Sequence, residues 1–100
     1  MILELAILDV KPEQEQAFEQ AFAQAQQIIS AMHGYVSHQL QKNMETPGRY
    51  ILLVNWEKLE DHTVGFRESA LYQEWKTLLH HFYHPFPQVE HYQLVYGKDS

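Results

Sequence analysis

The chain has 100 residues, 45% of them hydrophobic and 13% aromatic, which is typical of one compact domain with a single core. Its 13 acidic residues outnumber its 7 basic ones, and the formal net charge of -6 would repel a nucleic-acid backbone. Cysteine is absent, which excludes disulfides, thiolate metal sites and a cysteine nucleophile.

The N-terminal sequence MILELAILDVKPEQEQ has neither a basic leader nor a small-residue cleavage site. No run in the chain reaches the roughly 20 apolar residues that cross a bilayer. We therefore expect a soluble cytoplasmic protein with one domain over residues 1–100, and neither a membrane nor a nucleic acid as a partner.

The first predicted element is a buried strand, ILELAILDV, which is short, apolar and bounded by Lys11-Pro12. Pro12 is expected to open a helix, and Gly34 to end it. Within this helix, apolar residues recur in steps of four and three and form one stripe. The stripe consists of Phe18, Phe22, Ala25, Ile29 and Met32.

Two further strands are predicted from the next segments. YVSHQLQKN, residues 35–43, alternates polar and apolar residues as a half-buried strand does. METPGR, residues 44–49, is the expected hairpin loop, and RYILLVNW, residues 49–56, is the third strand. KLEDHTVG, residues 58–65, is expected to form a short helix or helical turn.

Ser69 is a suitable N-cap for a second long helix. HPFP ends that helix, because a residue before proline disfavours helical geometry. QVEHYQLVY, residues 88–96, alternates again and predicts a last strand. The apolar stripe of the helix is expected at Leu71, Trp75, Leu78 and Phe82, with Tyr72 and Leu79 beside it.

The βαββαβ order predicts a ferredoxin-like α+β fold, a four-stranded antiparallel sheet with both long helices on one face. Strands one and three are apolar at consecutive positions, in LAIL and ILLV, so both sheet faces need cover. Two helices cover only one face. We therefore expect a homodimer that packs sheet to sheet, the alternative being a partly exposed apolar face.

The segments GYVSHQL and YILLVNWEKLEDHTVGFRESALYQEW resemble the antibiotic biosynthesis monooxygenase (ABM) family, and the similarity covers about residues 2–96. The most characteristic part is a strand ending in Trp-Glu, an acidic turn with a His, then Phe-Arg and Ser-x-x-Tyr-x-x-Trp. The resemblance implies a dimeric α+β barrel with a pocket between helices and sheet in each subunit. It also implies a cofactor-independent monooxygenase that brings dioxygen to a quinol or another small phenolic or polycyclic aromatic molecule.

Comparison with individual branches of the family narrows this expectation. The haem-degrading branch has an Asn on the first strand and a His on the last helix, where this chain has Leu5 and Trp75 followed by Lys. Only Trp56 matches that pattern, which disfavours haem degradation. The polyketide-oxygenating branch has an Asn four residues before this Trp and a Tyr six residues after it, where this chain has Leu52 and His62.

His62 and Arg67 are the candidate catalytic residues. A phenolate or hydroquinone anion can itself donate an electron to oxygen, so the protein must remove a proton and hold the anion, and a histidine suits that task at neutral pH. Arg67 could stabilise the anionic oxygen. The alternatives are that His62 packs a surface turn, and that Arg67 pairs with Glu60, Asp61 or Glu68.

The candidate substrate-binding residues are mostly aromatic, as expected for a flat slot that holds an aromatic ring. They are Trp56, Phe66, Tyr72, Trp75 and Leu52. Equally, these side chains could belong to the plain core. Asn55 alternates with Trp56 and is expected on the opposite sheet face.

The sequence argues against a metal site and a nucleotide site, but it leaves two other functions open. A metal at His80 and His84 is disfavoured, because Pro85 disturbs the helical spacing and no carboxylate or cysteine completes the set. No phosphate loop or Rossmann glycine pattern provides a seat for a nucleotide cofactor. The same pocket would also suit a non-catalytic dimeric binding or stress-associated protein, or an isomerase of a small oxygenated metabolite.

Overall fold

A computed structural model of the chain describes residues 1–98. Its elements follow the predicted βαββαβ order, with a short helical turn after the third strand. In chain order they are β1 (Ile2–Asp9), α1 (Glu15–Ile29), β2 (Tyr35–Lys42), β3 (Arg49–Trp56), the π-helical turn η1 (Asp61–Phe66), α2 (Ala70–Leu79), the 3-10 turn η2 (His80–Phe82) and β4 (Val89–Gln93).

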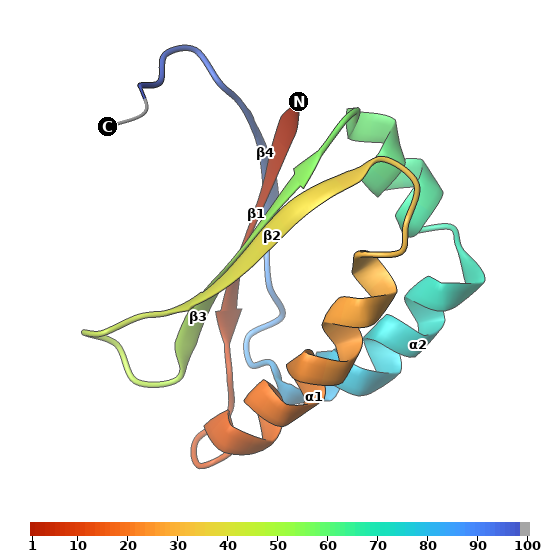
Figure 1. The fold of residues 1–100 in the computed structure, drawn as a ribbon. Coiled ribbons are helices and arrows are strands. Elements are labelled where there is room, and N and C mark those ends of the chain that lie inside the picture. Colours follow the sequence, from red (N-terminus) through yellow and green to blue (C-terminus); the bar gives the residue numbers. More distant parts are fainter. Residues whose placement is uncertain (99–100) are drawn as a thin grey trace.

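The strands form one antiparallel sheet in the order β2-β3-β1-β4, and the predicted ferredoxin-like α+β fold is confirmed. Both long helices lie on the same face of the sheet and contact each other (Figure 1). The sheet of the single chain stays open, with β2 and β4 at its edges. No helix among residues 1–98 has the length and apolar character needed to span a membrane.

The two faces of β1 carry different side chains, because side chains alternate along a strand. Glu4, Ala6 and Leu8 point toward the helices and are buried. The antiparallel register places His91 of β4 opposite Glu4, and Leu52 of β3 opposite Ala6. The inner face of the sheet therefore includes one carboxylate among apolar neighbours.

Helix α1 differs from the prediction at both ends. It begins at Glu15 and not at Pro12, because Glu13 between them has a φ of 67°, outside the right-handed helical region. It ends at Ile29, before Gly34 is reached. Gly34 has a φ of 82° and belongs to the connection into β2, where glycine adopts this conformation without steric cost.

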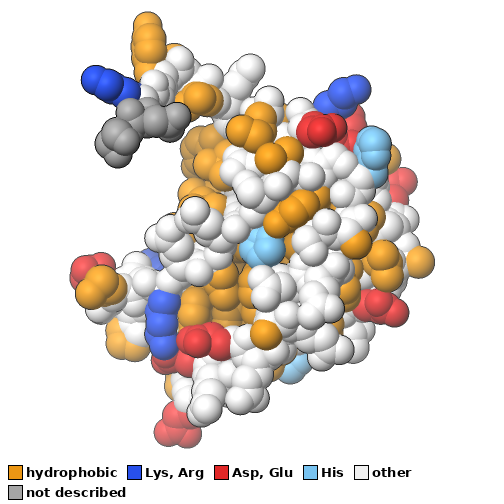
Figure 2. Space-filling model, viewed as in Figure 1, with side chains coloured by type: hydrophobic (Ala, Val, Ile, Leu, Met, Phe, Trp, Pro, Cys, Tyr) orange, Lys and Arg blue, Asp and Glu red, His pale blue; other side chains and the backbone are white. Residues whose placement is uncertain are grey.

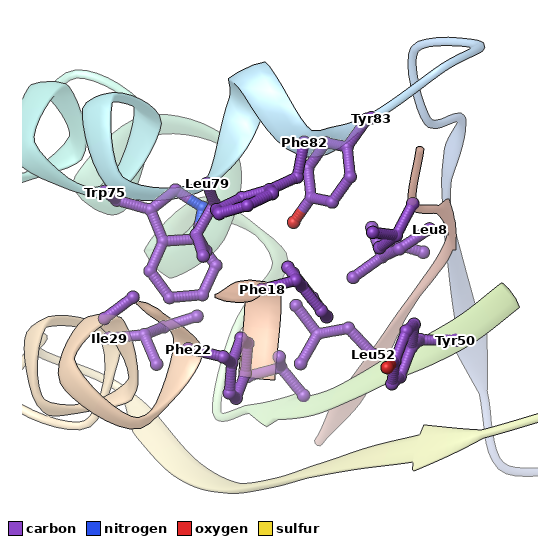
Figure 3. Close-up of a cluster of buried hydrophobic side chains, with 14 of the residues drawn as sticks. Leu8, Phe18, Phe22, Ile29, Tyr50, Leu52, Trp75, Leu79, Phe82 and Tyr83 are labelled. Atoms are coloured by element: carbon purple, nitrogen blue, oxygen red, sulfur yellow. The ribbon is translucent and has the colours of Figure 1, made fainter. Parts of the chain in front are cut away.

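The hydrophobic core lies between the helices and the inner face of the sheet. Figure 3 shows side chains from both helices, from η2 and from the strands meeting in this cluster. The predicted stripe of α1 is confirmed: Phe18, Phe22, Ala25 and Ile29 are buried, and Met32, beyond the helix end, is partly buried. Since a buried Phe or Leu contributes about 1.5–3 kcal/mol, this cluster fixes the helices to the sheet.

Helix α2 begins as predicted, and most of its predicted apolar stripe is buried. The N–H of Tyr72 donates to the hydroxyl of the N-cap Ser69 at 3.2 Å. Trp75 and Leu79 are the buried residues of the helix. Leu71, predicted in the apolar stripe, is 40% exposed, so that prediction is wrong. The helix is rotated so that Tyr72 and Trp75 face the sheet.

The other sheet face carries the apolar residues that were expected to need cover. They are Leu3, Leu5, Ile7, Ile51 and Leu53, all of them partly exposed. Asn55 lies on this face, as predicted, where its side-chain amide donates to the hydroxyl of Ser37 at 3.0 Å. Within residues 1–98 no helix covers this face (Figure 1).

The last strand is shorter than predicted, since β4 ends at Gln93. After it the chain runs away from the helices (Figure 1). Leu94, Val95 and Tyr96 in this segment are 77%, 81% and 93% exposed. Figure 2 shows hydrophobic side chains projecting from the body of the molecule along it. The segment and the uncovered sheet face together present apolar surface to the outside.

Candidate functional site

A cavity of about 420 Å³ lies between the inner face of the sheet and the layer formed by η1 and α2. Strands β1, β3 and β4 contribute its floor, while η1 and α2 contribute its roof. The segment after α2 closes one side with Tyr83, Phe86 and Pro87. A ligand here would contact mainly aromatic and aliphatic side chains, with a few polar groups to orient it.

The π-helical turn η1 brings His62 and Phe66 to the cavity. The N–H of Arg67 donates to the carbonyl of His62, five residues earlier, at 3.1 Å. Asp61 supports the start of the turn by accepting from the N–H of Lys58 at 3.1 Å. His62 and Phe66 are both buried, whereas Arg67 is exposed at the rim of the same cavity.

Gly34 fixes the approach of this turn to the sheet. A Cβ at Gly34 would lie 2.0 Å from Oδ2 of Asp61, so that only a glycine fits here. The carbonyl of Gly34 also accepts from the N–H of Glu57 at 2.8 Å. The connection before β2 and the turn after β3 are thus held together, and this positions His62.

His62 is 3% exposed and lies within a network of buried groups. Its Nδ1 is 2.8 Å from Nε2 of His91, and its Nε2 is 3.3 Å from Oε1 of Glu4. Its ring stacks on Trp56, with centroids 5.5 Å apart and planes 20° apart. The alternative of a histidine packing a surface turn does not describe this environment.

Glu4 is the second buried polar residue of the network, at 5% exposure. Its Oε1 accepts from the indole N–H of Trp56 at 3.0 Å. Burial raises the pKa of Glu4, while the Trp56 hydrogen bond and the charge of Arg67 oppose that rise. The carboxylate of Glu4 is therefore a stronger base than an exposed one.

The pKa of His62 is lowered to about 3, first by burial and then by the positive charge of Arg67 and the neighbouring His91. Burial and Arg67 also lower the pKa of His91. At neutral pH both rings are thus uncharged. Burial raises the pKa of Tyr72, and here too the charge of Arg67 acts in the opposite direction. Arg67 therefore acts electrostatically on each group at this end of the cavity.

A family model described as antibiotic biosynthesis monooxygenase matches residues 1–78. The chain belongs to this family. It is 60% identical over 95 residues to the uncharacterised protein YczJ of Bacillus subtilis (strain 168). The alignment covers 95% of this chain and 100% of YczJ.

Solved structures agree with this membership of the ABM family. A candidate antibiotic biosynthesis monooxygenase from Bordetella bronchiseptica is 39% identical, with a TM-score of 0.91 over 95% of this chain and 97% of the other. SnoaB, a cofactor-independent oxygenase from Streptomyces nogalater, is 14% identical, with a TM-score of 0.82 over 96% of this chain and 94% of the other. At that identity the second likeness shows the fold alone.

The structure brings most of the predicted site residues of this ABM domain to one cavity. Those in its wall are His62, Arg67, Phe66, Tyr72, Trp75 and Leu52. Trp56 lies outside the wall, behind the imidazole of His62, and is 0% exposed. Trp56 thus contacts the network through its ring and its N–H. Among residues 1–98 Arg67 forms no salt bridge, and the predicted surface ion pair with Glu60, Asp61 or Glu68 is not seen.

Two residues of the network, Glu4 and His91, were not predicted as site residues. Glu4 lies in a strand that was interpreted only as apolar. It is two residues from the inward-facing Ala6, so its side chain lies on the same face of the sheet. His91 lies in the middle of the segment that was predicted only as the last strand. A charged residue at an inward position of a buried strand was the signal that could have identified Glu4.

The remaining histidines do not form a metal-binding set among the described residues. Within residues 1–98 no group of three or more His, Asp or Glu side chains lies close enough to hold a metal ion. His80 lies in the cavity wall and His84 is exposed. His38, on β2, bonds Tyr35 and Gln26 away from the cavity.

Proposed function

We propose that this chain is a cofactor-independent monooxygenase that acts on a small phenol or quinol. The observation that carries the proposal is the position of His62 in the wall of an aromatic-lined cavity, with Arg67 at its rim. Membership of the ABM family supports the reaction class. The cytoplasmic location stays a prediction from the sequence.

The proposed chemistry needs proton removal and charge stabilisation, because the substrate itself supplies electrons to dioxygen once it is an anion. His62 belongs to the proton-accepting network, which also includes Glu4 and His91. Arg67, which forms no salt bridge among residues 1–98, is proposed to bind the anionic oxygen. Phe66 packs edge-to-face against the rings of Tyr72 and Trp75, and it is proposed to contact the ring of the substrate.

The size of the cavity favours a compact substrate. Ligand sites commonly measure about 300–1,000 Å³. The volume here, about 420 Å³, lies in the lower part of that range. We therefore propose a substrate of one or two rings, such as a hydroquinone or a menadiol-like compound, in preference to a larger polycyclic one.

Oxygen uptake tests this function. The purified chain is expected to consume oxygen above the blank with at least one member of a panel of hydroquinones and naphthoquinols, and His62→Ala is expected to abolish the excess. Autoxidation in the absence of protein supplies the blank for each compound. Uptake equal to the blank with all compounds would overturn the monooxygenase proposal.

A binding protein without turnover is the second candidate function. It is favoured by one observation: both ring nitrogens of His62 already lie against protein side chains, Nδ1 at 2.8 Å from His91 and Nε2 at 3.3 Å from Glu4. Under this reading a thermal-shift screen finds aromatic ligands that raise the melting temperature, while no compound is oxidised. The oxygen-uptake panel separates the two candidates.

We further propose that two chains associate through the open sheet face. The apolar residues of that face, among them Ile7 at 41% exposure, lack a cover within the single chain. The projecting residues Leu94 and Tyr96 add apolar surface that association could bury. Light scattering at micromolar concentration is expected to give twice the monomer mass for the wild type, and Leu53→Lys on the same face is expected to shift it toward monomer. A wild-type monomer would contradict the proposal.

A further inference from the structure

Glu4 is a carboxylate that is almost completely buried, yet one of its oxygens is not used by the protein. Its Oε1 takes both recorded contacts, the Trp56 N–H at 3.0 Å and Nε2 of His62 at 3.3 Å. Among residues 1–98, Oε2 has no hydrogen-bond partner. A carboxylate usually satisfies both oxygens when it is buried, because an unpaired one is costly.

The cavity explains where Oε2 is directed. Within the described residues, no fully enclosed side-chain oxygen or nitrogen lacks a partner, so Oε2 is not sealed inside the protein. Glu4 is 5% exposed and is part of the cavity wall. The accessible part of this side chain therefore faces the cavity, and Oε2 is a free hydrogen-bond acceptor there.

Both ring nitrogens of His62, by contrast, lie against protein side chains: Nδ1 is hydrogen-bonded to His91 at 2.8 Å, and Nε2 lies 3.3 Å from Oε1 of Glu4. A neutral imidazole has one donor and one acceptor nitrogen. If Nε2–H donates to the carboxylate of Glu4, Nδ1 is left to accept from Nε2–H of His91. This tautomer pairs Nδ1 of His62 with His91 and directs Nε2–H toward the carboxylate. Both nitrogens already have a protein neighbour, and the unpartnered acceptor in the cavity wall is Oε2 of Glu4.

The electrostatics point in the same direction as the geometry. Burial raises the pKa of Glu4 and so makes its carboxylate a stronger base than an exposed one. The pKa of His62, lowered to about 3, makes its imidazole a weaker base. The charged and titratable groups that face Glu4 are His62 and Arg67 from η1 and its end, His91 from β4 and Tyr72 from α2.

We propose that Oε2 of Glu4 takes the proton of the substrate hydroxyl, with His62 and His91 as positioning residues. The inference rests on the proposed monooxygenase function and identifies the atom that touches the substrate. In this step the substrate O–H bond breaks, its electron pair stays on the substrate oxygen and the proton binds Oε2. Arg67, at the rim of the same cavity, holds the anion that is formed.

Glu4→Gln tests this assignment with little change in shape. The amide oxygen can still accept from Trp56, but an NH2 group replaces Oε2 and cannot take a proton. With a hydroquinone that the wild type oxidises, we expect oxygen uptake to fall at least about 100-fold. Glu90→Gln is the matched control, because Glu90 lies on β4 with an exposed side chain and is expected to leave uptake unchanged.

A binding measurement tests the same atom without any turnover. 2-Naphthol can donate a hydrogen bond to Oε2, whereas its methyl ether, 2-methoxynaphthalene, cannot. We expect the wild type to bind 2-naphthol about tenfold more tightly than the ether, as measured by calorimetry. Glu4→Gln is expected to lose this preference, and Glu90→Gln to keep it.

The two measurements separate the inference from the function on which it rests. If the wild type oxidises a quinol and Glu4→Gln is equally active, the inference falls and the function stands. If no quinol is oxidised but the naphthol preference depends on Glu4, the function falls and the acceptor role of Oε2 stands. Equal wild-type affinity for the naphthol and its ether overturns the inference even if the Glu4 variant does not fold.

Discussion

Two histidines on the helix-facing side of the sheet invite comparison, His38 on β2 and His62 on η1. Each has both ring nitrogens engaged, and burial is the first cause of the lowered pKa of each. His38 contacts the hydroxyl of Tyr35 and, at 2.9 Å, the amide oxygen of Gln26. These partners are neutral, and His38 contributes nothing to the cavity wall.

His62 differs in the nature of its partners and not in their number. It joins a second imidazole to a buried carboxylate, and the same carboxylate reaches the cavity. Engagement of the imidazole therefore does not separate a structural histidine from a functional one. A titratable partner with access to a ligand does separate them.

The largest expected effect concerns turnover. His62→Gln removes the imidazole that orients Glu4, and we expect kcat for quinol oxidation to fall about 100-fold, since misplacement of a catalytic group by about 1 Å has this cost. His38→Gln, the same substitution outside the cavity, is expected to change kcat by less than about twofold. Steady-state oxygen uptake with both variants checks this, and equal losses would show that the two histidines are equivalent.

The next effect concerns the donor to the carboxylate. Trp56→Phe keeps an aromatic ring against His62 but removes the N–H that donates to Oε1 of Glu4. Hydrogen bonds to charged groups contribute about 1.5–3 kcal/mol, so we expect Trp56→Phe to lower the free energy of unfolding by about 2 kcal/mol more than Trp75→Phe. Trp75 is the control because, within residues 1–98, its indole N–H makes no protein hydrogen bond.

Urea denaturation of both tryptophan variants at one protein concentration provides the comparison, because association would make stability depend on concentration. Equal losses for the two would mean that the Trp56 N–H does not stabilise the carboxylate. In that case the Trp56 hydrogen bond would not oppose the rise in the pKa of Glu4 that burial causes, and the network would be weaker than its geometry indicates.

The sequence predicted the fold better than the site, and particular residues show why. The N-cap at Ser69 and the alternation along β3 depend on neighbours within a few residues, so local patterns were sufficient. The start of α1 was wrong because the positive φ of Glu13 follows from no pattern in the sequence. His62 was identified only through the resemblance to the ABM family.

The partners of His62 could not be predicted because they come from distant strands. His91 is 29 residues away, and Glu4 reaches the same place only because β1 pairs with both β3 and β4. The pKa of His62 depends on burial and on the charge of Arg67, and the spacing of residues along the sequence predicts neither. Local propensity places the elements, whereas register and burial make the site.

The smallest expected effect is the part of the pH dependence of stability that His62 contributes. Its pKa falls from the ordinary value of 6.5 to about 3 in the folded protein, so the unfolded chain binds the proton more readily. The contribution of His62 is thus complete above pH 6.5 and is lost as the pH falls toward 3. Between pH 7 and pH 5.5 this loss is about 1 kcal/mol.

Glu4 acts with the opposite sign, because its raised pKa favours proton uptake by the folded state as the pH falls. The wild type alone would therefore show a partly cancelled slope. The stability difference between the wild type and His62→Gln is expected to shrink by about 1 kcal/mol from pH 7 to pH 5.5. A difference that stays constant over this range would mean that His62 accepts a proton as easily in the folded protein as in the unfolded chain, so that burial does not lower its pKa.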